Sequence, residues 1–163
     1  STQLRIDGAI YRFNARGYMV TGWVYEDGQW YYYGASGGQS AGWVRVHGTW
    51  YYLDPLTGAM ASGWTKVQGT WYYLSSSGAM RTGWVRDGSA WYYLTSSGAL
   101  ATGLQRVGSS WYYLSSDGGA MATGWLRDGD AWYYLTSSGA MATGSRWIDG
   151  TRYAFDGEGR LMP

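Results

Sequence analysis

A tandem repeat of about 20 residues covers almost the whole chain, and it constrains the possible folds more than any other feature. A Gly-Trp pair recurs in steps of 20 or 21 residues, and a second Trp follows each pair by seven residues and opens a Trp-Tyr-Tyr triplet. The Gly-Trp positions are Trp23, Trp43, Trp64, Trp84 and Trp125, with Leu104 where one further copy is due. The triplets begin at Trp30, Trp50, Trp71, Trp91, Trp111 and Trp132. A short fixed period of this kind is typical of proteins in which each repeat packs mainly against its two neighbours.

Degenerate copies at both ends bring the predicted number of repeats to eight, in a single repeat module that spans residues 1–163. The predicted repeats are 3–22, 23–42, 43–63, 64–83, 84–103, 104–124, 125–144 and 145–163. Each contains two short runs rich in Trp, Tyr and Val, separated by turn residues such as Asp87-Gly88, and none shows helical periodicity. A single hairpin is marginally stable in water, so we expect an all-β solenoid of about eight stacked β-hairpins. If Asp87-Gly88 is the two-residue loop, Trp84 and Trp91 lie directly opposite each other on one face of the hairpin. The Gly lies one position away in other repeats, which predicts that both turn type and register vary between hairpins.

Strand alternation predicts aromatic corners between consecutive hairpins. The two Trp residues of a repeat share one face, whereas the first Tyr of each triplet lies on the other face and meets the Trp pair of the preceding repeat. The five complete corners predicted are Trp23, Trp30 with Tyr51; Trp43, Trp50 with Tyr72; Trp64, Trp71 with Tyr92; Trp84, Trp91 with Tyr112; and Trp125, Trp132 with Tyr153. A sixth, degenerate corner, Trp111 with Tyr133, has Leu104 in place of its first Trp. Met60, Met80, Met121 and Met141 are expected either to close a fourth side or to pack in the core, where Leu53, Leu74 and Leu94 are expected.

The end repeats favour a role for the Trp pairs at the junctions. The last repeat has no successor, and Ser145 and Arg152 stand at its two Trp positions, yet it keeps Tyr153 at the first Tyr position. A role in the core alone gives no reason for that selective loss. The first junction, with Gln3 and Ile10 at its Trp positions, is not expected to form a site.

The chemistry of three electron-rich rings suits a quaternary ammonium ion, because its methyl groups are apolar and its charge is attracted to ring faces. Three cation–π contacts with methyl burial predict affinity of roughly millimolar, about −4 kcal/mol. Sugar stacking on the same rings is an alternative. A third possibility is a structural spacer whose corners are filled by neighbouring side chains.

Composition argues against several other functions. The chain has no Cys and one His, His47 in a predicted turn, so we expect no metal, no cofactor and no His-based catalytic triad. A formal net charge of +1 argues against nucleic acid as a partner. The chain contains no run of eighteen apolar residues, so no membrane span is predicted. The eleven acidic residues lie mostly in predicted turns, so no catalytic carboxylate pair is expected. We therefore expect a non-catalytic binding module, with any catalytic domain outside this chain; the start at Ser1, without a signal peptide, fits a mature or truncated product.

One repeat in full is Gly63-Trp64-Thr65-Lys66-Val67-Gln68-Gly69-Thr70-Trp71-Tyr72-Tyr73-Leu74, followed by Gly78-Ala79-Met80. In such repeats the sequence resembles the choline-binding modules of pneumococcal and related phage cell-wall proteins, over nearly the whole chain and weakly at 1–20 and 145–163. The resemblance implies a left-handed β-solenoid in which choline is caged by two Trp of one hairpin and a Tyr of the next. It also implies choline or phosphocholine on teichoic or lipoteichoic acid as the partner, and an extracellular location at the bacterial cell wall surface.

Two departures and one related family bear on this resemblance. Leu104 removes a wall of the sixth corner, and Gln39 stands where other repeats have Met. Similar repeats in streptococcal glucan-binding enzymes and clostridial toxins bind sugars, but they favour Tyr-Tyr-Phe and rarely keep two Trp per repeat. Glucan or polysaccharide binding is therefore the alternative function.

Overall fold

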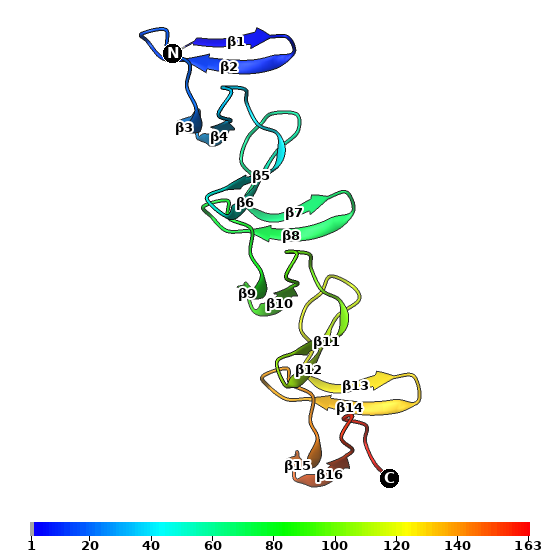
Figure 1. The fold of residues 1–163 in the computed structure, drawn as a ribbon. Helices are drawn as coiled ribbons and strands as arrows, with labels where there is room; N and C mark the ends of the chain where they lie inside the picture. Colours follow the sequence, from blue (N-terminus) through cyan, green and yellow to red (C-terminus); the bar gives the residue numbers. More distant parts are fainter. Residues whose placement is uncertain (1) are drawn as a thin grey trace. The chain divides into compact units, whose positions relative to one another are not determined.

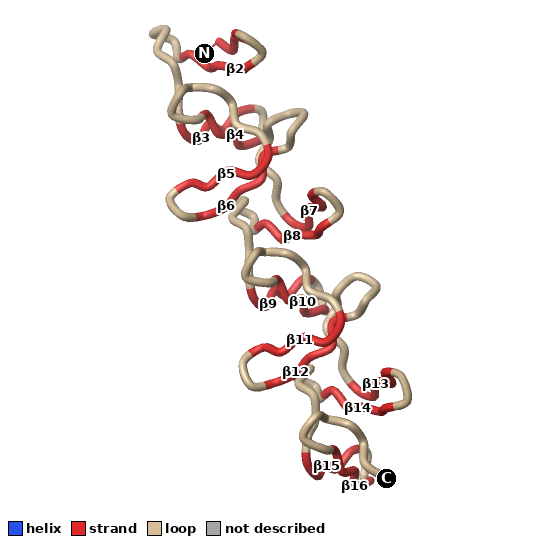
Figure 2. Tube along the Cα trace, turned by 45° about the vertical axis from the view of Figure 1, so that its right-hand side comes forward, coloured by secondary structure: helices blue, strands red, loops and turns tan. Residues whose placement is uncertain are grey.

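Sixteen strands of five residues form eight antiparallel hairpins in the computed structural model, which describes residues 2–163 (Figure 1). The chain divides into two compact halves, one up to Arg81 and one from Thr82. The N-terminal half contains β1 (Thr2–Ile6), β2 (Ala9–Phe13), β3 (Gly22–Glu26), β4 (Gln29–Tyr33), β5 (Gly42–Val46), β6 (Thr49–Leu53), β7 (Gly63–Val67) and β8 (Thr70–Leu74). The C-terminal half contains β9 (Gly83–Asp87), β10 (Ala90–Leu94), β11 (Gly103–Val107), β12 (Ser110–Leu114), β13 (Gly124–Asp128), β14 (Ala131–Leu135), β15 (Gly144–Ile148) and β16 (Thr151–Phe155). Residues 2–163 include no helix, and so none that is able to cross a membrane; the all-β prediction is confirmed (Figure 2).

Two kinds of two-residue turn close the hairpins. In the first kind Gly is the second turn residue and both residues have positive φ, as in His47 (47°) and Gly48 (86°), which is the type I′ pattern. In the second kind Gly comes first, as in Gly88 (58°) followed by Ser89, which is the type II′ arrangement. The prediction that turn type varies between repeats is therefore confirmed.

The register is the same in all eight hairpins, because both turn types contain two residues. The first Trp position always pairs with the second Tyr position, as Trp84 does with Tyr93. The prediction that Trp84 and Trp91 lie directly opposite each other is wrong, as is the expected variation in register. The loop is Gly88-Ser89, one residue later than Asp87-Gly88, because a type II′ turn needs Gly at its first position; Trp91 then pairs with Arg86. The two Trp residues are diagonal neighbours on one face of the hairpin.

In every hairpin except the first, the last residue of the second strand is buried and forms the core; the equivalent Phe13 of the first hairpin is half-buried. Leu53, Leu74 and Leu94 are completely buried, as predicted, and the equivalent Tyr33, Leu114, Leu135 and Phe155 are at most 2% exposed. The loop that follows each hairpin folds back over this residue, so that Leu53 forms an isolated bridge with Met60. The Ser/Thr/Gly-rich stretches of the sequence therefore form loops that fold back and cover the core.

Backbone hydrogen bonds join successive hairpins within each half. The amide of Met60, in the loop after β6, donates to the carbonyl of Trp30 in β4 at 2.7 Å, and Met121 donates in the same way to Trp91 at 2.7 Å. Within each half, these loops thus connect to the second Trp position of the preceding hairpin, which Ile10 occupies in the first hairpin. This connection sets the spacing at which the aromatic side chains of neighbouring hairpins meet.

Candidate functional site

The Trp23 corner shows how the repeat assembles three rings. Trp23 and Trp30 extend from one face of hairpin β3–β4, with ring centroids 6.4 Å apart and planes at 88°. Tyr51, in β6 of the next hairpin, has its ring centroid 4.8 Å from that of Trp23, at 66°. The rings enclose three sides of a cavity of about 280 Å³, which Met60 and Ser77 also line. The sequence therefore correctly predicted which three rings meet here.

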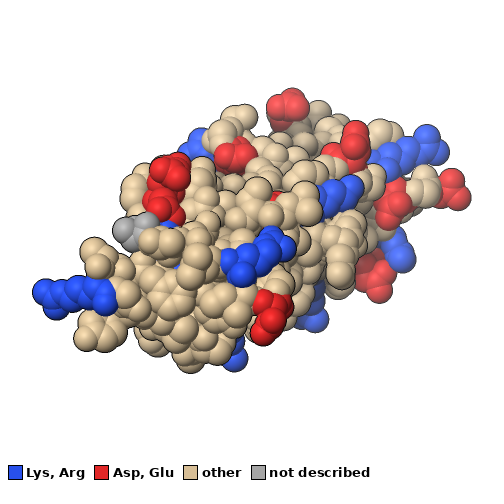
Figure 3. Space-filling view, turned by 90° about the horizontal axis from the view of Figure 1, so that it is seen from above, with Lys and Arg blue, Asp and Glu red and all other residues tan. Residues whose placement is uncertain are grey.

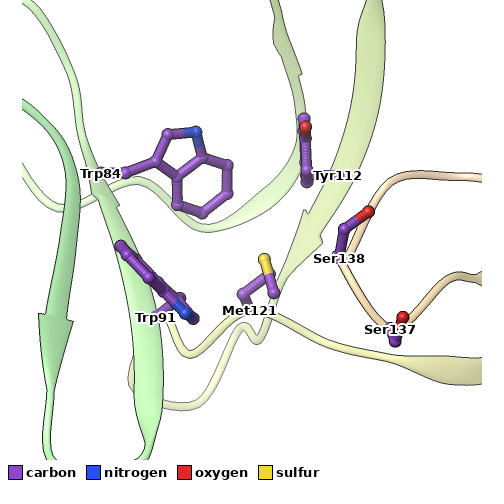
Figure 4. Close-up of a pocket in the computed structure, with 6 residues that line it drawn as sticks. All are labelled: Trp84, Trp91, Tyr112, Met121, Ser137 and Ser138. Atoms are coloured by element: carbon purple, nitrogen blue, oxygen red, sulfur yellow. The ribbon is translucent and has the colours of Figure 1, made fainter.

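The corresponding corner of the C-terminal half has a cavity of about 260 Å³ (Figure 4). Trp84 and Tyr112 have ring centroids 4.8 Å apart, at 66°. Figure 4 shows the two indoles and the phenol facing a common space, with the sulfur of Met121 at its edge. The lining residues are Trp84, Trp91, Tyr112, Met121, Ser137 and Ser138. In this corner Met121 contributes a fourth side, which was one of the two roles expected for the Met residues.

Two more of the predicted corners have the same geometry. Centroid distances are 6.4 Å for Trp43 with Trp50 and 4.8 Å for Trp43 with Tyr72. The corresponding distances are 6.3 Å for Trp125 with Trp132 and 4.9 Å for Trp125 with Tyr153. The remaining predicted corner takes Trp64 and Trp71 from the N-terminal half and Tyr92 from the C-terminal half, and its assembly stays a prediction.

The degenerate corner also comes together. Leu104, Trp111 and Tyr133 line a cavity of about 330 Å³, with Met141 at the position of the other Met residues. Its other lining residues are Gly157, Glu158 and Arg160. Leu104 thus replaces one aromatic wall, as predicted, and the cavity is somewhat larger than those of the complete corners.

Sequence reasoning missed three sets of residues around the corners. The second Tyr of each triplet supports the first Trp from the same hairpin face, as Tyr32 does at 5.0 Å from Trp23. Basic side chains cover the second Trp in two hairpins: Arg45 lies 6.0 Å from the ring centroid of Trp50, and Lys66 lies 5.7 Å from that of Trp71. Both contacts follow from the cross-strand register, in which Arg45 pairs with Trp50 and Lys66 pairs with Trp71.

The third missed set is the Ser residues. Ser77 and Ser137 reach their corners from the loop after the hairpin two repeats further on. The Ser-rich stretches are visible in the sequence, but how far each loop reaches depends on how the hairpins stack. No local pattern encodes that distance.

Polar contacts replace aromatic ones at the two end hairpins. Gln3, at a Trp position of the first hairpin, donates a hydrogen bond to the hydroxyl of Tyr33 at 3.1 Å, and Arg12 forms an ion pair with Glu26. In the last hairpin Arg152 donates to the hydroxyl of Ser145 at 3.2 Å. Gln3, Ser145 and Arg152 thus form polar contacts at Trp positions of the end hairpins, in the way expected of caps.

Residues 2–163 contain no group of three or more His, Cys, Asp or Glu side chains placed to hold a metal ion. The acidic side chains lie mainly in loops, where Asp54 accepts hydrogen bonds from the backbone and side chain of Thr57 and from the amide of Leu56. These bonds lower the pKa of Asp54, because they stabilise its charged form.

Gly139 lies against Met121, which lines the Trp84 corner, and it has a left-handed backbone conformation. Its φ is +80°, and a Cβ there would lie 2.2 Å from the sulfur of Met121. Gly139→Ala is therefore expected to displace Met121 and to shift the indole N–H resonance of Trp84, in addition to a loss of roughly 1–2 kcal/mol of unfolding free energy from the left-handed backbone. Denaturant unfolding and NMR measure the two effects.

Gly144→Ala is the matched control. Gly144 has a φ of +68°, but a Cβ there meets no atom within 4 Å. It is expected to lose the same stability from the backbone and to leave Trp84 unchanged. Equal shifts of the Trp84 resonance in both variants would contradict the role given to Met121.

The family is identified by comparison with known proteins. The family model described as the choline-binding repeat matches residues 4–41, 27–63, 61–102, 101–145 and 122–162. The chain therefore belongs to the choline-binding repeat family. A search of curated protein sequences found no match.

Solved structures from Streptococcus pneumoniae share the fold. CbpJ is 45% identical, with a TM-score of 0.92 over 94% of this chain and 56% of that chain. Choline-binding protein F, solved with a peptidoglycan analogue, is 39% identical, with a TM-score of 0.88 over 99% of this chain and 57% of that one. The choline-binding domain of CbpL is 38% identical, with a TM-score of 0.74 over 98% of this chain and 85% of that one. The predicted solenoid of stacked hairpins is thus confirmed, and this chain spans little more than half the length of the first two relatives.

Proposed function

We propose that the chain is a non-catalytic module that binds choline in its aromatic corners and so attaches a protein to phosphocholine-bearing teichoic or lipoteichoic acids at the bacterial cell wall surface. The observation that carries this proposal is the recurrence of one open, three-ringed cavity in both halves. Membership of the choline-binding repeat family supports the same ligand.

The exposure of the second Trp residues argues against a purely structural spacer. Trp30, Trp91 and Trp132 are 43%, 41% and 44% exposed, and the cavities beside Trp30 and Trp91 are not filled by neighbouring side chains. Large apolar side chains exposed at regular intervals are typical of a binding surface. Packing of the core is accomplished by Leu53 and its equivalents, which are completely buried.

The polar lining favours an ammonium ion over a sugar. Apart from the indole N–H groups and the phenol hydroxyl of the rings themselves, the polar groups that line the Trp23 corner are those of Ser77, and those that line the Trp84 corner are those of Ser137 and Ser138. A glucan has several hydroxyl groups per ring, each of which requires a hydrogen-bond partner when it leaves water. A trimethylammonium group donates no conventional hydrogen bond and is stabilised by the ring faces themselves.

Several corners on one chain explain how weak sites hold a polymer. Once one corner has bound, the next phosphocholine of the same polymer is present at an effective concentration of about millimolar, and avidity can exceed single-site affinity by about 10²–10⁴. Charged side chains of both signs are interspersed on the face seen in Figure 3, and the net charge is +1. Recognition therefore relies on the corners rather than on general attraction to a polyanion.

The test is retention on isolated cell walls that carry phosphocholine. We expect the protein to bind these walls and to be released by millimolar choline, whereas ethanolamine, which has the same charge without the methyl groups, releases it poorly. Walls from which phosphocholine has been removed, and cross-linked dextran, are the controls. Retention on dextran that choline does not reverse would establish glucan binding instead.

A further inference from the structure

The Leu104 corner differs from the complete corners in more than the loss of one Trp. In the Trp84 corner the loop two repeats further on contributes Ser137 and Ser138. The equivalent loop after β16 contributes Glu158 and Arg160 to the Leu104 corner. This corner therefore combines two aromatic rings with two charged side chains.

Arg160 lies at the Tyr133 wall of the corner. The guanidinium of Arg160 is charged, as arginine is throughout the physiological range. A side-chain hydrogen bond with Tyr133 and the nearby carboxylate of Glu158 raise its pKa further. Nη1 of Arg160 lies 3.0 Å from Oε2 of Glu158. A quaternary ammonium ion at this wall would meet a cation that is already present, and it would lack the first indole. These changes disfavour choline at the Leu104 corner.

A second, polar hollow of about 500 Å³ adjoins this corner. The two cavities share Trp111, Met141, Gly157 and Glu158. Arg106, which pairs with Trp111 across hairpin β11–β12, and Arg146, from β15, both line the hollow. Its remaining lining is rich in hydroxyl groups, from Ser109, Ser110, Thr136, Ser138 and Thr143.

We propose that the Leu104 corner and the adjoining hollow together form a binding site for an anionic, hydroxyl-bearing ligand of the sugar phosphate class. Arg106 and Arg146 supply the planar donors that suit phosphate oxygens. The Ser and Thr hydroxyls donate hydrogen bonds to sugar hydroxyls and accept them, and the Glu158 carboxylate accepts them. The exposed ring of Trp111, 42% accessible, offers an apolar face to a sugar ring. The site does not require the other corners to bind choline.

The experiment is an NMR titration of the full chain in saturating choline, read at the indole N–H of Trp111, which Trp111→Phe identifies. The probes are glucose 1-phosphate, glucose and inorganic phosphate. We expect glucose 1-phosphate to shift this resonance with saturation, and the other two to bind at least tenfold more weakly. Arg106→Gln with Arg146→Gln is expected to weaken glucose 1-phosphate binding at least tenfold. The matched control is Arg86→Gln, which removes a charge at the equivalent position opposite Trp91 and should have no effect.

Three outcomes would overturn this proposal: equal shifts with glucose, equal shifts with inorganic phosphate, or an equal loss of binding in Arg86→Gln. The first would mean stacking without charge recognition, and the second a simple anion site. The response of Trp84 to choline is recorded in a parallel titration of the same protein, so failure of the sugar phosphate site and failure of choline binding are distinguishable.

Discussion

Trp84→Ala is expected to lower the number of choline sites on the chain by one and to leave the other corners intact. The ring of Trp84 lies 4.8 Å from Tyr112 and 5.1 Å from Tyr93, so its loss removes one wall and leaves two. One cation–π contact contributes about 0.5–2 kcal/mol, and the methyl groups also lose their apolar cover. Binding at this corner should weaken by roughly tenfold or more, which puts it beyond a millimolar titration. Calorimetry measures the stoichiometry.

Trp147→Ala is the control for this variant. Trp147 is 74% exposed in the last hairpin, at a position that pairs with Arg152 and does not belong to a corner. The number of sites should stay the same. A lost site in Trp147→Ala, or an unchanged number in Trp84→Ala, would contradict the assignment of the corners.

Leu53→Ala is expected to lower the free energy of unfolding by about 2–5 kcal/mol. Leu53 is completely buried where the loop after β6 returns over the hairpin, and truncation leaves a cavity beneath the bridge to Met60. Because Met60 lines the Trp23 corner, this variant should also weaken ligand binding there. Denaturant unfolding with Trp fluorescence measures the first effect.

Leu56→Ala removes the same atoms three residues away. Leu56 is 96% exposed, so its truncation should change stability by less than about 0.5 kcal/mol. If the two variants were equally stable, the returning loop would not seal a core at Leu53.

The fold could be predicted from the sequence because the repeat length and the turn residues both indicate one hairpin per repeat. Two aromatic runs and one Gly-containing turn in each 20 or 21 residues leave a hairpin as the natural folding unit. The exact register of the hairpin that contains Trp84 could not be predicted in the same way. Asp87-Gly88-Ser89 contains two possible two-residue loops, and Asp-Gly is a common type I′ pair. The backbone uses Gly88-Ser89, which shifts the partner of Trp91 by two residues.

The aromatic corners were predictable for a different reason. Alternation decides the face of each ring, and a shift of the turn by one residue moves the partner of Trp91 by two and so preserves that face. Trp84, Trp91 and Tyr112 therefore meet despite the wrong register. The contribution of Ser77 was not predictable, because it lies more than two repeats from Trp23 and reaches the corner only through stacking. Arg160 at the Leu104 corner was missed in the same way.

The most direct test of choline binding in the corners is a choline titration of the full chain, followed by calorimetry and Trp fluorescence, with a dextran oligomer in parallel. Saturable binding of choline at roughly millimolar concentration, with about five sites and no response to dextran, is the predicted result. A response to dextran without one to choline would contradict the account and assign the corners to sugars, and no response to either ligand would contradict a binding role for the corners altogether.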